Sequence, residues 1–215
     1  MENEMSVNSK VDYTILKATA TKQQLENLCE VAVKNSYFSV CVNPCNISFC
    51  KEYLKKLGKN SVKIATVVGF PLGANATETK VFETKQALLD GADEIDVVLN
   101  IGRAKDGDFE YVKNELKEVK KAAGEHVVKV ILETCYFEMA DVEKLVKVCV
   151  DAGVDFVKTS TGFGTAGANN EVVNLMFKTA AGRCKVKASG GIKTREQAVE
   201  LIKNGASRIG TSSEI

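Results

Sequence analysis

Short β-rich runs alternate with amphipathic stretches along almost the whole chain. The runs are "VDYTIL", "FSVCVN", "VKIATVVGF", "EIDVVLN", "VVKVILET", "VDFVKTS", "KVKASG" and "RIGTSS". Between them, apolar residues recur at helical spacing, as in 109–119, where Phe109, Val112, Leu116 and Val119 form one stripe. The pattern predicts eight strands alternating with helices.

Helix boundaries repeat with the same regularity. Thr21 with Gln24, and Thr194 with Gln197, have the spacing of a capping box at the start of a helix. Six glycines, 23 to 33 residues apart, each close a helical stretch just before an apolar run: Gly58, Gly91, Gly124, Gly153, Gly182 and Gly205. Eight units of roughly 27 residues predict a (β/α)8 barrel formed by a single domain over residues 1–215, in preference to a doubly wound open sheet.

The period of two in the strands predicts which side chains point into the barrel. One phase is apolar and is expected to face the helices, for example Ile95, Val97, Val128 and Val130. The opposite phase is polar and contains Asp12, Thr14, Cys41, Asn43, Glu94, Asp96, Lys129, Glu133, Lys158, Lys187 and Ser189. Residues of this phase near the strand ends are expected to converge where active sites of such barrels lie.

Two lysines of this inward set, Lys158 and Lys187, are expected to meet the carboxylate of Asp96. A structural ion-pair network is one interpretation. Two ammonium groups ~6 Å apart at an effective dielectric of ~20 repel by roughly 2.8 kcal/mol, or about two pKa units. A lysine made neutral in this way attacks carbonyls to form a Schiff base, and Asp96 would move protons, so no metal or organic cofactor is required.

Three glycine-bearing segments after the late strands predict a phosphate site. They contain Gly162 in "TSTGFGTAG", Gly190 and Gly191 in "SGGIKT", and Gly210, Ser212 and Ser213 in "GTSSEI". Loops after strands seven and eight of such barrels commonly hold phosphate through backbone N–H groups. A tight turn also uses glycine, so the three segments together carry this prediction.

Overall composition excludes several other classes of protein. Lys and Arg number 29 against 28 Asp and Glu, which predicts no nucleic-acid partner and no attraction to an anionic membrane. Seven cysteines without CxxC spacing and one histidine, His126, favour neither a disulfide framework nor a metal site. A cytoplasmic location is expected, because the first ten residues do not resemble a signal peptide and no apolar run is long enough to span a membrane.

The ordered segments resemble those of the class I deoxyribose-phosphate aldolases over essentially the whole chain. The resemblance rests on "VDYTILKATAT", "SVCVNP", "GFPLGAN", "EIDVVLNIG", "VKVILETC", "DFVKTSTGFG", "VKASGGIKT" and "RIGTSS". It implies a (β/α)8 barrel that reversibly cleaves 2-deoxy-D-ribose 5-phosphate to D-glyceraldehyde 3-phosphate and acetaldehyde, in deoxynucleoside catabolism.

The resemblance also assigns roles to residues. Lys158 would form the Schiff base, Lys187 would lower its pKa, and Asp96 would take part in proton transfer. Phosphate-side positions would be Gly162, Gly190, Gly191, Gly210, Ser212 and Ser213, and pocket-lining positions Asp12, Thr14, Cys41 and Lys129. Asp12 and Thr14 would bond to substrate hydroxyls.

The chain departs from the family pattern in two places. Tyr13 stands where many relatives show histidine, and Ile215 follows Ser213 by two residues, where relatives continue into a final helix. The expected barrel therefore has its final helix truncated or missing, with the segment after strand eight frayed. A Schiff-base lyase for another sugar phosphate and a non-catalytic sugar-phosphate-binding barrel remain the alternatives, and homo-oligomer formation is left open.

Overall fold

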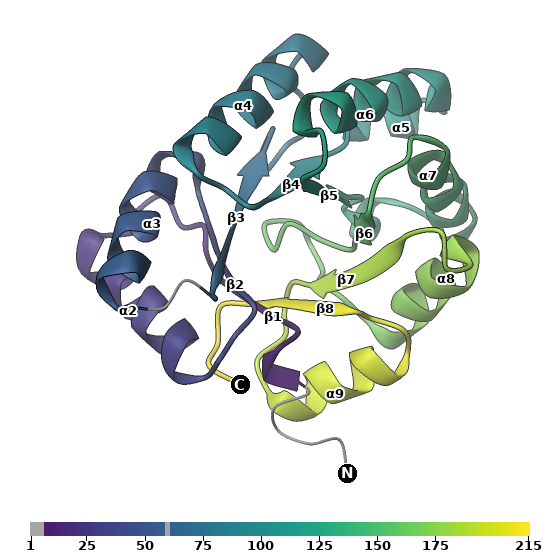
Figure 1. Cartoon of the computed structure of the whole chain (residues 1–215). Coiled ribbons are helices and arrows are strands. Elements are labelled where there is room, and N and C mark those ends of the chain that lie inside the picture. The colour runs from purple at the N-terminus through teal and green to yellow at the C-terminus, as the bar shows by residue number, and fades with distance from the viewer. Residues whose placement is uncertain (1–6, 59–60) are drawn as a thin grey trace.

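Eight parallel strands close into a barrel in the computed structural model, which describes residues 7–58 and 61–215 (Figure 1). The strands are β1 (Val11–Ile15), β2 (Ser39–Val42), β3 (Lys63–Val68), β4 (Glu94–Val98), β5 (Val127–Ile131), β6 (Phe156–Lys158), β7 (Lys185–Ser189) and β8 (Arg208–Thr211). Each strand pairs with the next, and β8 pairs with β1. The predicted (β/α)8 barrel is confirmed, and an open sheet is excluded.

Helices surround the barrel, as Figure 1 shows. They are α2 (Lys22–Lys34), α3 (Ile47–Lys56), α4 (Thr77–Asp90), α5 (Ile101–Lys105), α6 (Phe109–Ala123), α7 (Met139–Asp151), α8 (Asn170–Ala180) and α9 (Arg195–Lys203), with 3-10 turns η1 (Pro44–Asn46) and η2 (Thr134–Tyr136). Both predicted capping boxes are present, at Thr21 and Thr194. All six glycines of the repeat have positive φ, as a chain that leaves a helix for a strand requires.

The hydrophobic core lies between the barrel and its helices. Outward side chains such as Ile95, Val97, Val128 and Val130 are fully buried in it. The inside of the barrel holds a much smaller apolar cluster of Leu16, Cys41, Ala65 and Val67. The rest of the interior is therefore available for charged groups, as the period of two predicts.

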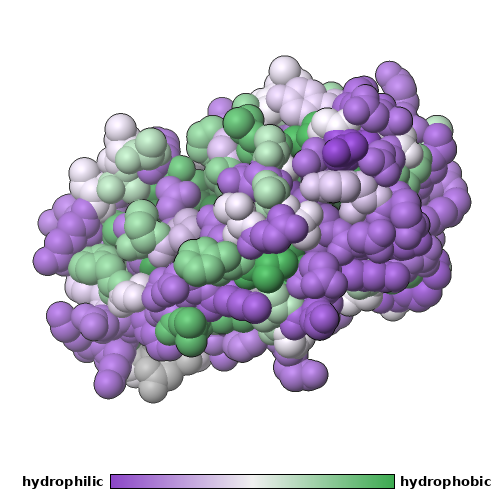
Figure 2. Space-filling view, turned by 90° about the horizontal axis from the view of Figure 1, so that it is seen from above, coloured by the Kyte–Doolittle hydropathy of each residue, from purple (hydrophilic) through white to green (hydrophobic). Residues whose placement is uncertain are grey.

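The face of the molecule seen from above is largely hydrophilic (Figure 2). Figure 2 shows one face on which hydrophobic residues stand among hydrophilic ones. In the described ranges, none of the helices is both long enough and apolar enough to cross a bilayer.

Residues 212–215 follow β8 without forming a helix in the described structure. The hydroxyl of Tyr37 donates to the carbonyl of Ile215 at 2.9 Å and accepts from its N–H at 3.0 Å. The N–H of Ser213 donates to Thr211 Oγ1 at 2.9 Å. The expectation of a frayed segment after strand eight was therefore wrong, because side chains of β8 and of the turn before β2 hold it.

Candidate active site

One carboxylate joins the two predicted lysines inside the barrel. Lys158, the last residue of β6, lies 2.8 Å from Asp96 Oδ2 through its Nζ atom. Lys187 of β7 contacts the same oxygen at 2.7 Å. Both amino groups therefore share one acceptor, which the β4 strand presents from the middle of its length.

Further charged groups surround this pair. Lys129 Nζ lies 2.8 Å from Asp96 Oδ1 and 2.6 Å from Glu94 Oε2. Lys187 Nζ lies 2.5 Å from Asp12 Oδ2, and Arg208 Nη1 lies 2.9 Å from Asp12 Oδ1. We call these seven residues the interior charge cluster: Asp12, Glu94, Asp96, Lys129, Lys158, Lys187 and Arg208.

Burial and pairing act differently on the three lysines of the cluster. Burial lowers the pKa of Lys158; Asp96 opposes this shift, and the neighbouring Lys187 cation adds to it. Burial also acts against the charge of Lys187, but Asp12 and Asp96 outweigh it, so its pKa is raised. Burial opposes the charge of Lys129 as well, and Asp96 with other carboxylates raises its pKa. Lys158 is the lysine from which a proton is most easily removed.

The number of charges leads to the same conclusion. In the described parts of the chain, the cluster contains four basic side chains and three carboxylates. Burial would raise the pKa of Asp96, but its three lysine neighbours hold that pKa well below the usual range, so Asp96 stays ionised. The cluster is electrically neutral when one lysine has lost its proton. A buried cluster favours that neutral state.

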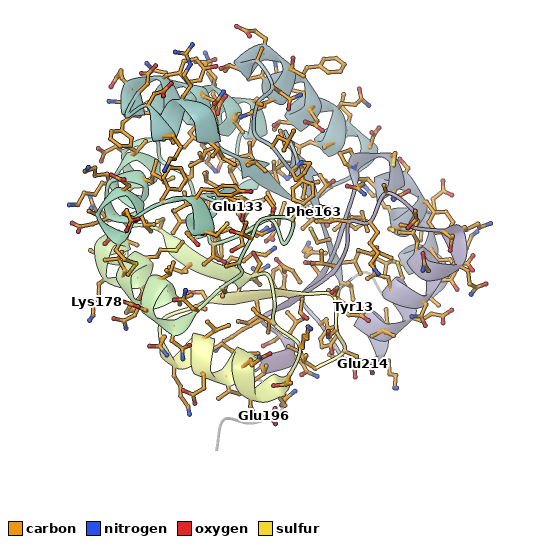
Figure 3. All side chains as sticks on the ribbon, turned by 180° about the vertical axis from the view of Figure 1, so that it is seen from behind. Tyr13, Glu133, Phe163, Lys178, Glu196 and Glu214 are labelled. Carbon is orange, nitrogen blue, oxygen red and sulfur yellow. The ribbon has the colours of Figure 1, made fainter. Side chains whose placement is uncertain are left out.

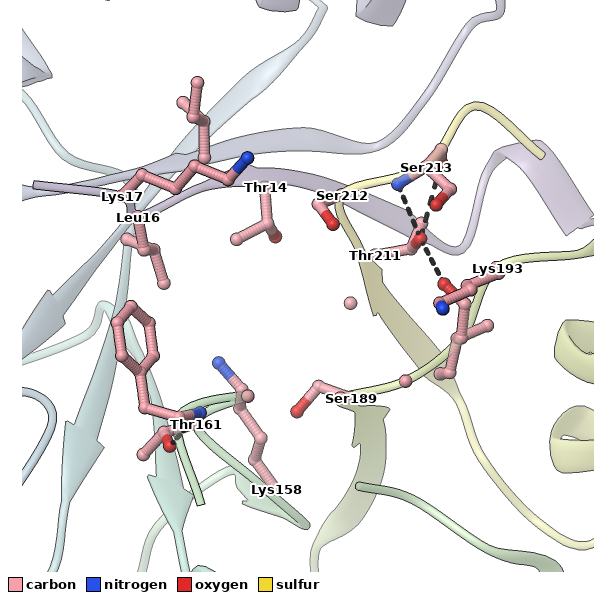
Figure 4. A pocket seen from close by; sticks show the side chains of 17 residues that line it. Thr14, Leu16, Lys17, Lys158, Thr161, Ser189, Lys193, Thr211, Ser212 and Ser213 are labelled. Carbon is pink, nitrogen blue, oxygen red and sulfur yellow. Dashed lines mark hydrogen bonds between the residues drawn. The ribbon is translucent and has the colours of Figure 1, made fainter. Parts of the chain in front are cut away.

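A cavity of about 410 Å³ opens directly above Lys158 at the carboxyl end of the barrel (Figure 4). Segments after β1, β6, β7 and β8 form its wall. Its lining includes eight of the predicted site residues: Thr14, Lys158, Gly162, Gly190, Gly191, Gly210, Ser212 and Ser213. The loop glycines and the amine are thus brought to one cavity.

Three predicted pocket residues lie elsewhere. Asp12, Cys41 and Lys129 are fully buried and are not part of the cavity lining. Asp12 accepts from Ser39 Oγ at 2.7 Å in addition to its two cationic partners. Asp12 is thus engaged within the barrel, two residues before Thr14 on β1, and its bond to a substrate hydroxyl stays a prediction.

Sequence reasoning missed several lining residues. Lys17, Lys193 and Phe163 contribute to the cavity, and its lining includes three lysines but, among the described residues, neither Asp nor Glu. The cavity is thus locally cationic although the net charge of the chain is only +1. Lys193 lies two residues after Gly191 in the "SGGIKT" segment and could have been found from that position. Arg208 lies two residues before Gly210 on β8, so the two residues face the same side of the strand. The period of two could therefore have identified Arg208 as an inward residue.

Glu133 fixes the loop that follows Lys158. It follows β5 with a left-handed backbone (φ 54), and its carboxylate accepts hydrogen bonds from the N–H and the hydroxyl of Thr161. The Thr161 hydroxyl oxygen in turn accepts from the N–H of Phe163 at 2.9 Å. Figure 3 shows Glu133 and Phe163 near the centre of the barrel mouth. Phe163 packs edge-on against Phe70 with centroids 5.3 Å apart and forms an apolar side of the opening.

Two adjoining loops touch through glycine. A Cβ atom at Gly167 would lie 2.0 Å from the carbonyl oxygen of Gly190. The N–H of Ala168 donates to the carbonyl oxygens of Ser189 and Gly190, at 3.1 Å each. The loop after β6 thereby holds the glycine turn after β7 in place.

Comparison with known proteins identifies relatives over the same length. Residues 7–212 match the DeoC/LacD family of aldolases. The chain is 51% identical to the deoxyribose-phosphate aldolase of Mycoplasma capricolum, over 99% of this chain and 94% of that protein. It is 52% identical to the enzyme of the same name from Thermococcus kodakarensis, over 99% of this chain and 96% of that protein.

Solved structures agree with the sequence relatives. The aldolase QR15 superposes with a TM-score of 0.92 at 40% identity, covering 97% of this chain and 92% of that one. The deoxyribose phosphate aldolase of Aeropyrum pernix, described as tetrameric, superposes with a TM-score of 0.89 at 33% identity, covering 100% of this chain and 90% of that one. The sequence match, the barrel and the lysine-bearing cavity agree, and the chain belongs to the DeoC/LacD family of aldolases.

Proposed function

We propose that this aldolase reversibly cleaves 2-deoxy-D-ribose 5-phosphate to D-glyceraldehyde 3-phosphate and acetaldehyde through a Schiff base on Lys158. The names of the relatives supply the substrate. The observation that carries the proposal is the position of Lys158, which belongs to the interior charge cluster and also lines the cationic cavity. No other lysine in the described residues does both.

Cleavage begins with the neutral amine. Lys158 Nζ attacks C1 of the open-chain sugar, and loss of water from the carbinolamine leaves an iminium ion. A base removes the proton of the C3 hydroxyl, the C2–C3 bond breaks, and its electron pair moves to C2 to give an enamine. Glyceraldehyde 3-phosphate leaves, C2 takes up a proton, and hydrolysis of the iminium releases acetaldehyde.

Asp96 and Lys187 are the groups within reach of these proton transfers. Lys187 Nζ donates a hydrogen bond to Asp96 Oδ2 at 2.7 Å, and Lys158 Nζ donates to the same oxygen at 2.8 Å. Asp96 as a carboxylate and Lys187 as an ammonium can pass protons directly or through water. Lys187 also stabilises the neutral form of Lys158 by charge repulsion.

The opposite side of the cavity suits the phosphate. In Figure 4, Ser212, Ser213 and Lys193 lie across the opening from Lys158. Gly190 and Gly191, both with positive φ, lie beside them and allow backbone N–H groups to approach an anion. A substrate with its aldehyde at Lys158 would extend its 5-phosphate to this side.

Borohydride trapping tests the proposal. The protein is incubated with 2-deoxyribose 5-phosphate, reduced and digested, and the adduct is located by mass spectrometry. We expect an adduct on Lys158 and none on Lys17 or Lys193, which line the same cavity and serve as internal controls. Lys158→Met should remove both the adduct and the activity. If the parent protein is not labelled, or if the variant is labelled equally, the assignment of the Schiff base to Lys158 is wrong. If labelling occurs only with another sugar phosphate, the proposed substrate is wrong.

The wider setting follows from the same substrate. We propose that the reaction serves deoxynucleoside breakdown in the cytoplasm. We also propose that the protein is a homo-oligomer, which is supported by the tetramer described for the Aeropyrum pernix relative. Light scattering of the purified protein would measure the number of subunits.

A further inference from the structure

Arg208 is a buried cation that the aldol chemistry above does not use. It begins β8, two residues before Gly210 of the cavity wall, and is only 7% exposed. Its Nη1 atom lies 2.9 Å from Asp12 Oδ1 and 3.1 Å from Glu94 Oε2. The guanidinium carbon also lies 3.5 Å from the ring centroid of Phe38, at cation–π distance.

A continuous chain of ion pairs leads from Arg208 to the reactive amine. Asp12 binds Arg208 through Oδ1 and Lys187 through Oδ2, at 2.9 and 2.5 Å. Lys187 then shares Asp96 Oδ2 with Lys158. The Asp12 carboxylate thus has an ion pair at each oxygen, and it links the Arg208 guanidinium to the Lys187 ammonium.

Arginine differs from the other cations of the cluster because its guanidinium does not lose its proton in proteins. The four cations exceed the three carboxylates by one only when Arg208 is counted. Without Arg208, three lysines would face three carboxylates, and a deprotonated Lys158 would leave a buried net negative charge. The neutral amine depends on a cation in the layer below it.

We propose that Arg208 is a positioning residue for the aldol reaction, acting through Asp12 and Lys187 to keep Lys158 uncharged. The inference rests on the proposed Schiff-base function of Lys158. The groups that face Lys158 are Asp96 of β4, Lys187 of β7 and the Cys41 thiol of β2. Those that face Arg208 are Asp12 of β1 and Glu94 of β4, and Glu94 also binds Lys129 of β5.

The test compares substitutions of opposite sign in the acid limb of kcat/KM against pH, which reports the free enzyme. Arg208→Gln removes the excess cation, so Lys158 holds its proton more tightly and the midpoint should move up by about one pH unit. Glu94→Gln removes a carboxylate, so the midpoint should move down. The double variant restores an excess of one cation and should return the midpoint close to that of the parent. Arg103→Gln, at an exposed arginine paired with Asp108, should leave the midpoint unchanged.

A merely structural role would lower stability or kcat without opposite shifts. Unchanged midpoints in Arg208→Gln and Glu94→Gln, or shifts of both in one direction, would overturn the proposal. Circular dichroism shows whether Arg208→Gln folds. If it does not fold, the proposal is tested by the other two variants: the midpoint should move down in Glu94→Gln and return to that of the parent in the double variant. Borohydride labelling of the parent on Lys158 separates the two hypotheses: its absence refutes the proposed function, whereas a labelled Lys158 with unmoved midpoints refutes only the role of Arg208.

Discussion

At the scale of single residues, Lys158 differs from its two lysine neighbours in the number of carboxylates that it contacts. Among the residues that the structure describes, Lys129 and Lys187 each bind two carboxylates, whereas Lys158 binds only Asp96. All three are buried, so the lysine with the fewest counter-charges loses its proton first. Its position at the end of β6 also makes it the one that reaches the cavity.

Replacing Lys187 with leucine tests this comparison. Removal of the neighbouring cation should raise the pKa of Lys158, so the acid limb of kcat/KM should move to higher pH, with a loss of about tenfold or more in activity near neutrality. Lys185→Leu, at an exposed position on the same strand, is the matched control and should leave the limb in place. A pH profile of the Lys187 variant equal to that of the parent would contradict the role of the second lysine.

Sequence periodicity was informative for residues within strands and much less so for residues in loops. The inward phase grouped Asp96, Lys158 and Lys187 correctly inside the barrel, because alternation fixes the face of each strand residue. It does not fix the layer, so Asp12 was expected to line the pocket but lies outside the cavity lining. Lys17 was missed because side-chain direction in a loop follows no period.

At the scale of elements, the strands and main helices follow from the hydrophobic pattern, and the exceptions have local causes. The apolar run "VKIATVVGF" is longer than β3, which ends at Val68, because Gly69 turns the chain with φ 63. The helix α5 has five residues, which is too short for a helical period to be visible in the sequence. The loops after β6, β7 and β8 that line the cavity were found from their glycines, but the contact between the loops after β6 and β7 was not.

Gly167→Ala tests that contact between loops. The added methyl group would lie 2.0 Å from the Gly190 carbonyl, so the turn after β7 must shift. We expect KM for the sugar phosphate to rise by about tenfold, corresponding to about 1.4 kcal/mol of binding, with a smaller change in kcat. Gly102→Ala, where the nearest atom lies 3.6 Å away, is the control and should leave KM unchanged. An unaltered KM in the Gly167 variant would show that the loops are positioned independently.

At the scale of the whole molecule, barrel closure creates contacts that no local pattern contains. Asp12 and Arg208 are 196 residues apart in the chain and meet because β1 pairs with β8. The order of the strands could be predicted from the repeat, but the stagger between them decides which inward residues share a layer. The composition of the interior charge cluster therefore emerged only in three dimensions.

The same cluster makes the stability of the fold depend on pH. Burial would raise the pKa values of Asp12 and Asp96, but their cationic neighbours outweigh it and hold both below the usual range. In the unfolded chain these carboxyls take up protons near pH 3.9, whereas in the folded barrel they stay ionised to lower pH. Their stabilising contribution is thus complete above about pH 4 and is lost as the pH falls toward the folded pKa values.

Urea unfolding between pH 7 and pH 3 measures this dependence. Below about pH 4 the free energy of unfolding should fall by up to about 1.4 kcal/mol per pH unit for each of the two carboxylates. Asp12→Asn should be less stable at pH 7, because Lys187 and Arg208 each lose a counter-charge, but its stability should fall less steeply in acid because one titrating group is absent. If the free energy of unfolding falls with equal slope for the two proteins, Asp12 titrates alike in the folded and the unfolded chain. That result would contradict a stabilising effect of the ion pairs at its two oxygens.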